Sequence, residues 1–271
     1  MPSKYRAVSC NVKYYHARGQ MLTTHRKKQI LALLKKNGQV IAKEISQRMG
    51  VSEDTIRRDL RELAHEGLLQ RVHGGALPAS PAVADFAGRE LLRHEGKVAI
   101  AVAAAAMIQP GQLVILDGGT TAREIARHLH LELRATVATH SPTIALELIH
   151  HLSVEVILIG GRLFKHSVVS VGAAAIEAIG QIHADTFFMG VTGVHPQTGL
   201  TTGDYEEAAV KRALSHAAAE TIVLASSEKL NAASPYKIVG LEEVSSLITE
   251  RGVSDDHLKP YRDLGISITQ A

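Results

Sequence analysis

The sequence predicts an α/β protein made of an N-terminal winged helix-turn-helix domain followed by a larger domain built around a mostly parallel sheet. Short helical patterns and a surplus of basic residues fill the first 80 residues, and apolar strand-like runs alternate with helical stretches from about Lys97 onward. Between them, Pro78 and Pro81 interrupt helix and strand alike, which is typical of a linker. We therefore expect four segments: a flexible arm at 1–21, the winged helix-turn-helix at 22–77, a linker at 78–88 and the larger domain at 89–271.

The composition indicates a globular chain without a membrane segment. The 271 residues are 45% hydrophobic, which is enough for real cores. No apolar run reaches the roughly 18 residues of a membrane span, and the N-terminus lacks the apolar core of a secretory signal. Cys10 is the only cysteine, so an internal disulfide is impossible. A cytoplasmic location is the simplest interpretation.

The charge distribution is uneven along the chain. Residues 1–80 hold 15 Lys and Arg against 6 Asp and Glu, a net charge of +9, whereas residues 81–271 hold 15 against 21, a net of −6. A basic first part on an acidic body suggests a polyanionic partner for the first part. The alternative is a basic surface domain with no such partner.

Three amphipathic helices and a hairpin are expected in the basic part. Only Gly50 and Val51 join the second helix to the third, which is the spacing of a helix-turn-helix. Ser52 is a good N-cap for the third helix, and Gly67 ends it. The strand-turn-strand pattern that follows bends at His73-Gly74-Gly75 and would be a wing.

The third helix has the side chains of a DNA recognition helix. Its exposed polar positions would reach base edges in the major groove, and its arginines would contact phosphates or bases. A three-helix module that binds protein is the alternative, but the short turn, the wing and the charge favour double-stranded DNA. The candidate DNA-binding residues are Ser52, Glu53, Thr55, Arg57, Arg58, Arg61, Arg71 and His73.

Small and polar residues follow the predicted strands of the larger domain. Because carboxyl ends of parallel strands meet at one edge of a sheet, these residues would gather there, where α/β proteins bind ligands. The best phosphate candidate is Asp117-Gly118-Gly119-Thr120-Thr121, where glycines admit a ligand close to the backbone and a helix begins. The loop matches neither the P-loop nor the dinucleotide fingerprint, and a simple tight turn is the alternative.

The other candidates supply charge and hydrogen bonds around that loop. Lysines and an arginine would balance a phosphate, and carboxylates would accept from sugar hydroxyls, although Glu207 and Lys211 could form only a surface pair. Histidine spacings fit no ordinary zinc site, so we expect neither metal nor cofactor. The full candidate set for effector binding is Lys97, Asp117, Gly118, Gly119, Thr120, Thr121, Thr139, His140, Gly161, Arg162, Gly193, Asp204, Glu207, Lys211 and Lys229.

These motifs together resemble the DeoR family of bacterial transcription regulators. The basic part reads SEDTIRRDLREL and then RVHGGA, and the body reads DGGTT, LIGGRLF, GVTGVHPQTGLTTGDYEEAAVK and SSEKL, so the resemblance covers about residues 22–250. It implies an isomerase-like sensor domain, similar in fold to ribose-phosphate isomerases and CoA transferases. Two positions depart from the family's pattern: His140 replaces a frequent asparagine, and SSEKL shifts Lys229 by one residue.

The resemblance implies a sequence-specific DNA-binding transcription regulator. We expect a repressor of a carbohydrate-metabolism operon, controlled by a phosphorylated sugar or a related metabolite. A single winged helix reads few base pairs, so a homodimer or higher oligomer is expected. Two alternatives remain: a sugar-phosphate isomerase-like enzyme with a DNA-binding head, whose base would be Asp117, Asp204, Glu207 or Lys211, and a structural nucleoid protein.

Overall fold

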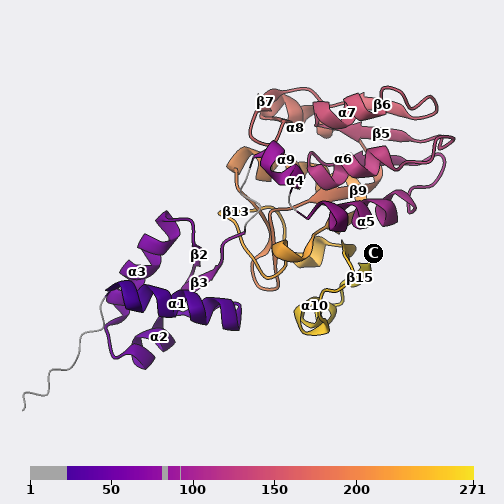
Figure 1. Cartoon of the computed structure of the whole chain (residues 1–271). Coiled ribbons are helices and arrows are strands. Elements are labelled where there is room, and N and C mark those ends of the chain that lie inside the picture. Colours follow the sequence, from indigo (N-terminus) through magenta and orange to yellow (C-terminus); the bar gives the residue numbers. More distant parts are fainter. Residues whose placement is uncertain (1–22, 81–84, 92) are drawn as a thin grey trace, which may run out of the picture.

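The computed structural model of the chain describes residues 23–80, 85–91 and 93–271 (Figure 1). The predicted arm at 1–21 and the middle of the predicted linker lie outside the described residues. Within them, no helix combines the length and the hydropathy needed to cross a membrane.

The N-terminal part is a winged helix-turn-helix. Three helices pack on a small antiparallel sheet of order β1-β3-β2, and Gly50, at φ 64°, makes the turn between the second and third helices. Strands β2 and β3 form the wing predicted from the sequence. The elements are α1 (Thr23–Asn37), β1 (Val40–Ile41), α2 (Ala42–Met49), α3 (Glu53–His65), β2 (Leu69–Val72) and β3 (Gly75–Pro78).

A buried ion pair joins the first and third helices of this domain. Arg26 and Asp59 lie 33 residues apart, and the Arg26 Nη2 donates to Asp59 Oδ1 at 3.0 Å. Both side chains are almost fully buried beside the apolar core of Ile30, Ile56 and Leu60. Each charge therefore needs the other, because an unpaired buried ion would be strongly destabilising.

The larger part is built on a seven-stranded sheet in which every strand pair is parallel, so the predicted parallel sheet is confirmed. The order is β15-β14-β12-β9-β4-β5-β6. Six of these strands match expected runs, and β14 was not predicted. Their bounds are β4 (Leu113–Leu116), β5 (Thr136–Thr139), β6 (Glu155–Leu158), β9 (Ala184–Gly190), β12 (Ala218–Leu224), β14 (Ser246–Thr249) and β15 (Ser267–Gln270).

Helices cover both faces of this sheet. Alternate residues of one strand point into different cores: Val114 and Leu116 pack with α5, α6 and α7, whereas Ile115 packs with α8, α9 and α10. Burial on both faces explains why the strands read as continuous apolar runs. The helices are α5 (His94–Ala105), α6 (Thr120–Arg127), α7 (Pro142–Leu148), α8 (Ala173–Ile179), α9 (Tyr205–His216) and α10 (Asp255–Arg262).

Several short elements connect the strands and helices of this domain. They comprise helix α4, an antiparallel hairpin of β7 and β8, a small sheet of order β10-β11-β13, and two 3-10 turns. They are α4 (Phe86–Leu91), β7 (Arg162–Phe164), β8 (Val169–Val171), β10 (Gly193–His195), β11 (Gly199–Thr202), η2 (Ser227–Lys229), β13 (Tyr236–Lys237) and η3 (Leu241–Glu243).

Candidate functional site

The DNA-binding candidates lie on α3 and the wing. Ser52 caps α3, since its hydroxyl oxygen accepts the backbone N–H of Thr55 at 3.2 Å. Glu53 accepts from Arg57 at 2.6 Å, one turn along the helix. A groove between α3 and the wing brings together four of the predicted residues: Arg57, Arg61, Arg71 and His73. Arg58 is exposed on the same helix.

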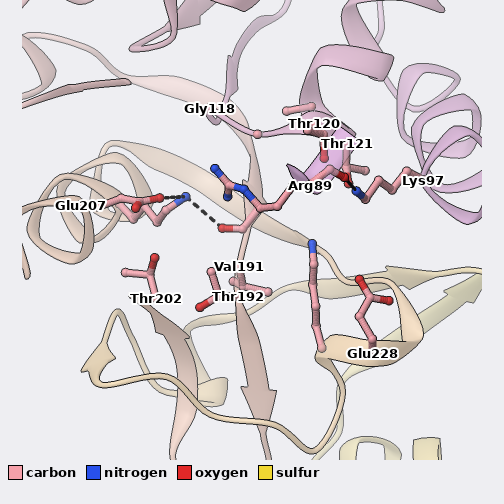
Figure 2. Close-up of a pocket in the computed structure, with 15 residues that line it drawn as sticks. Arg89, Lys97, Gly118, Thr120, Thr121, Val191, Thr192, Thr202, Glu207 and Glu228 are labelled. Atoms are coloured by element: carbon pink, nitrogen blue, oxygen red, sulfur yellow. Dashed lines mark hydrogen bonds and ion pairs between the residues drawn. The ribbon is translucent and has the colours of Figure 1, made fainter. Parts of the chain in front are cut away.

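A pocket lies at the carboxyl ends of β4, β9 and β12 (Figure 2). The loop before α6 forms one wall. Gly118 lets this loop pack closely against β8, because a Cβ at position 118 would overlap with Cγ1 of Val169. The lining residues are Arg89, Lys97, Gly118, Gly119, Thr120, Thr121, Ala122, Gly190, Val191, Thr192, Thr202, Glu207, Lys211, Glu228 and Lys229.

Buried cations dominate this pocket. Figure 2 shows Arg89 reaching into its centre, with Glu207 on one side and Thr120 and Thr121 on the other. Removal from water lowers the pKa of Arg89 and of Lys97, and it lowers the pKa of Lys229 to about 8.

The cations outnumber the carboxylates that could neutralise them. Lys211 is paired internally, with Asp117 and with Glu207 at 3.5 Å. The remaining pocket charges among the described residues are Arg89, Lys97 and Lys229 against Glu228. This surplus of positive charge in a site removed from water favours an anion.

Several buried polar atoms of the pocket lack a hydrogen-bond partner among the described residues. They are Nε and Nη2 of Arg89, Oγ1 of Thr202 and Oε2 of Glu228. Buried polar groups are nearly always hydrogen-bonded, because leaving one unsatisfied is costly. Donors of Arg89 together with the hydroxyl of Thr202 therefore suit a polar ligand rather than an apolar one.

Asp117 anchors the phosphate-candidate loop from behind. It is 0% exposed, and its Oδ1 lies 3.0 Å from Nε2 of His140, while its Oδ2 accepts from the backbone of Gly190 at 2.7 Å and from Lys211. Burial alone would raise the pKa of Asp117, but Lys211 and His140 hold this pKa well below its usual range. Nδ1 of His140 donates to the carbonyl of Ser170 at 3.0 Å.

Family models match both parts of the chain. A model described as "DeoR-like helix-turn-helix domain" matches residues 26–81, and one described as "DeoR C terminal sensor domain" matches residues 92–251. The chain belongs to the DeoR family.

Curated relatives in this family match most of the chain. A putative aga operon transcriptional repressor from Escherichia coli O157:H7 is 32% identical, over 91% of this chain and 93% of its own length. The regulator GlpR of Haloferax volcanii is 33% identical, over 92% and 98%. The glycerol-3-phosphate regulon repressor of Escherichia coli K12 is 33% identical, over 72% and 77%. These relatives are transcription regulators, and none supports the isomerase-like enzyme that the sequence left open.

The solved structures give a weaker likeness. Ribose 5-phosphate isomerase A from Methanocaldococcus jannaschii aligns with a TM-score of 0.38 and 18% identity, over 50% of this chain and 54% of that one.

The DeoR-family sensor domain brings together only part of the predicted effector set. Lys97, Gly118 to Thr121, Glu207, Lys211 and Lys229 line the pocket. Asp117, Thr139, His140 and Gly193 are buried outside its lining, so Asp117 has no free oxygen for a sugar hydroxyl and His140 does not face the pocket. Gly161 packs against Val171, exposed Arg162 pairs with Glu206, and Asp204 caps α9 and lines an adjoining cavity.

Seven lining residues were not among the sequence candidates, and four of them have charged or polar side chains: Arg89, Thr192, Thr202 and Glu228. Glu228 stands in the quoted SSEKL motif, and Thr192 and Thr202 stand in the long GVTG motif, so proximity to those motifs was a usable signal. Arg89 had no such signal, because it follows the predicted linker rather than a strand.

The wing of this DeoR-family chain is connected to the pocket wall by hydrogen bonds. Strand β3 ends at Pro78, whose carbonyl accepts the backbone N–H of Ala233 at 3.1 Å. Ser80 donates through its hydroxyl to the carbonyl of Thr192, a residue that lines the pocket. Beyond residues 81–84, the backbone N–H of Phe86 at the start of α4 donates to the carbonyl of His166 at 2.9 Å.

Proposed function

We propose that this DeoR-family regulator represses a carbohydrate-metabolism operon and that a phosphorylated sugar controls its affinity for DNA. The observation that carries the proposal is the pocket of buried, incompletely satisfied cations beside the N-terminus of α6. Among its relatives, one is named for the glycerol-3-phosphate regulon and one for the aga operon, which fits a carbohydrate-derived phosphate. As a DNA-binding regulator, the protein would act in the cytoplasm.

The phosphate would lie against the Gly118–Thr121 loop. The backbone N–H groups of the first turn of α6 have no partner within the helix, and they would donate to an anion together with the hydroxyls of Thr120 and Thr121. Arg89, Lys97 and Lys229 would supply charge, and a phosphate dianion matches their surplus over Glu228. Asp117 would act on the ligand only indirectly, by holding the loop in place.

DNA would bind the groove between α3 and the wing. Its arginines are exposed, and an α-helix of this kind fits the major groove while the wing contacts an adjacent part of the backbone. Ser52 and Thr55 satisfy one another at the helix start and would present the first turn of α3 to base edges.

The ligand would influence DNA binding through the linker contacts. Thr192 lines the pocket and also accepts from Ser80, two residues beyond the end of the wing strand. Its hydroxyl donates to Ser234 at 2.7 Å, next to Ala233, which bonds the same linker segment. A ligand that moves Thr192 would therefore shift the equilibrium between two arrangements of the wing relative to the pocket. This requires that the ligand binds the two arrangements with different affinity.

The protein would act as a homodimer or larger assembly. Strand β6 is an edge of the seven-stranded sheet, and large apolar side chains are exposed on it and on the neighbouring α7 region: Leu146, Ile149, Leu152 and Leu158. An apolar surface beside an open sheet edge suits burial against a second copy. Light scattering at micromolar concentration would test this, and a monomer would contradict it.

Two measurements on the full chain test the proposal. The first compares binding to the promoter fragment upstream of its gene with binding to random DNA of equal length at moderate salt; equal affinity would exclude sequence-specific regulation. The second measures the melting temperature with a panel of sugar phosphates, where ligand binding raises the temperature by mass action. Arg89→Met should abolish that rise, whereas Arg251→Met, at an exposed position outside the pocket, should preserve it.

A further inference from the structure

The pocket at the carboxyl ends of β4, β9 and β12, which we call the phosphate pocket, continues past Arg89 into a second cavity. We call this second cavity the hairpin chamber. It has a volume of about 150 Å³ and lies between the β7–β8 hairpin and the start of α9. Four residues line both spaces: Arg89, Thr192, Thr202 and Glu207. The two spaces are therefore adjacent parts of one site with Arg89 at their junction.

The hairpin chamber differs in chemistry from the phosphate pocket. The residues that it adds are Phe164, His166, Ser167, Gly203 and Asp204. Phe164 and His166 stack with ring centroids 5.8 Å apart and an interplanar angle of 24°.

Oxygen atoms rather than cations dominate the opposite wall of the chamber. Ser167 donates to Oε2 of Glu207 at 3.2 Å, and Asp204 caps α9 by accepting the backbone N–H of Glu207 at 2.9 Å through one oxygen, Oδ1. Carboxylate and hydroxyl oxygens accept hydrogen bonds from the hydroxyl groups of a ligand, while a flat ring pair can pack against its C–H groups.

Thr202 gives an independent indication that the junction holds a ligand. Its side chain is 0% exposed, it lines both spaces, and its hydroxyl has no hydrogen-bond partner among the described residues. A hydroxyl buried in this way is costly unless a bound group satisfies it. A molecule that extends from the phosphate pocket into the hairpin chamber would pass this atom.

We infer that the hairpin chamber receives the uncharged, hydroxylated end of the effector and that Phe164, His166 and Thr202 determine which sugar monophosphate is recognised. This inference rests on the proposed function, since it needs a phosphate beside the Gly118–Thr121 loop. The sugar hydroxyls would donate to Asp204 and Glu207 and accept from Thr202, with the ring pair covering the carbon skeleton.

The same chamber would discriminate against a second phosphate. A bisphosphate would place its second dianion beside the carboxylates of Asp204 and Glu207, and Arg89 at the junction would already contact the first phosphate. Adjacent like charges repel each other. The hairpin chamber therefore selects monophosphates.

Calorimetry on the full chain tests the inference with inorganic phosphate, a panel of pentose and hexose monophosphates, and the corresponding bisphosphates. We expect the best monophosphate to bind at least about 10-fold more tightly than inorganic phosphate and than its bisphosphate. His166→Ala should remove most of that gain while changing the affinity for inorganic phosphate less than about 2-fold, and the near-isosteric Thr202→Val should reduce the advantage of the monophosphate over inorganic phosphate. His183→Ala, at an exposed position outside both spaces, is the matched control.

The outcomes separate this inference from the proposed function. If sugar monophosphates bind but His166→Ala and Thr202→Val leave their advantage over inorganic phosphate intact, the chamber assignment is wrong and the sensor assignment stands. A bisphosphate that binds more tightly than its monophosphate also overturns the chamber assignment. If no phosphorylated compound binds, both are overturned.

Discussion

We predict that Lys229 makes effector binding depend on pH. Its side chain is 8% exposed, and burial lowers its pKa from 10.5 to about 8; Glu228 opposes this shift, while nearby cations, Lys97 foremost, reinforce it. A lysine with this pKa loses its proton within the range in which the protein can be studied. Because the proposed ligand is an anion, its affinity should fall as the pH rises through about 8.

The magnitude follows from the pKa. At about pH 7 roughly nine-tenths of Lys229 is charged, and at about pH 9 roughly one-tenth is, since each pH unit changes the ratio tenfold. A sugar phosphate has a second pKa near 6, so its own charge stays almost constant over this interval. If the charged lysine is needed, the Kd should rise about 8- to 10-fold between these pH values, or close to 1.3 kcal/mol.

Calorimetric titration of the full chain at several pH values measures this effect. Lys229→Met should bind more weakly at about pH 7 and give a nearly flat profile for the same ligand. Stability should change in the opposite direction: the lowered pKa means that the unfolded chain holds more protons between about pH 8 and 10.5, so this group stabilises the fold as the pH rises there. Wild-type affinity that stays constant from about pH 7 to about pH 9 would refute the reasoning.

Three further changes test other parts of the molecule. Asp59→Asn should leave the buried Arg26 without its counter-charge and lower the free energy of unfolding by about 3–5 kcal/mol, measured by urea denaturation; a loss below about 1 kcal/mol would mean that the pair is dispensable. Arg58→Ala should weaken promoter binding and reduce the slope of log affinity against log salt by about 1, in a salt series of anisotropy titrations; an unchanged slope would place Arg58 away from phosphates. Ser80→Ala should keep ligand affinity but reduce the effect of the ligand on promoter affinity, because the contact with Thr192 is lost; a full response would exclude that contact from the coupling.

The sequence predicted the sheet and the loop before α6 because both have strong local patterns. Strands buried on two faces read as apolar runs, and parallel strands end at a common edge, so the residues after Leu116 could be assigned to a site. Lys97, Lys211 and Lys229 were candidates because their charges would balance a phosphate, and all three line the pocket. They come from α5, α9 and η2, and the topology of the domain brings these elements together.

The elements that were missed lack a local signal. Helix α5 has the sequence HEGKVAIAVAAA, which is apolar almost all around and shows no helical period, since it packs against α6 and β14 together. Strand β14 was also missed, although it is as long as β4, β5 and β6. Arg89 enters the pocket from α4, so its role depends on a contact between segments far apart in the chain.

Asp117 shows a different limit of sequence reasoning. Its position after a strand suggested a ligand contact, but its carboxylate is held by His140, Lys211 and the backbone of Gly190. A sequence pattern can place a carboxylate at a sheet edge without revealing whether it faces the pocket or the loop behind it. That distinction requires the positions of partners 23 and 94 residues away.

The most direct test of the central claim measures promoter binding by the full chain through fluorescence anisotropy. The titration is done once with a sugar phosphate and once with the same sugar unphosphorylated. We predict that the phosphorylated form alone changes the Kd for the promoter by about 10-fold or more, the usual range of allosteric coupling. Arg89→Met should bind the promoter with wild-type affinity and show no response. An equal change in Kd with the unphosphorylated sugar, or a full change in Arg89→Met, would contradict a sensor that acts by binding the phosphate group of its effector.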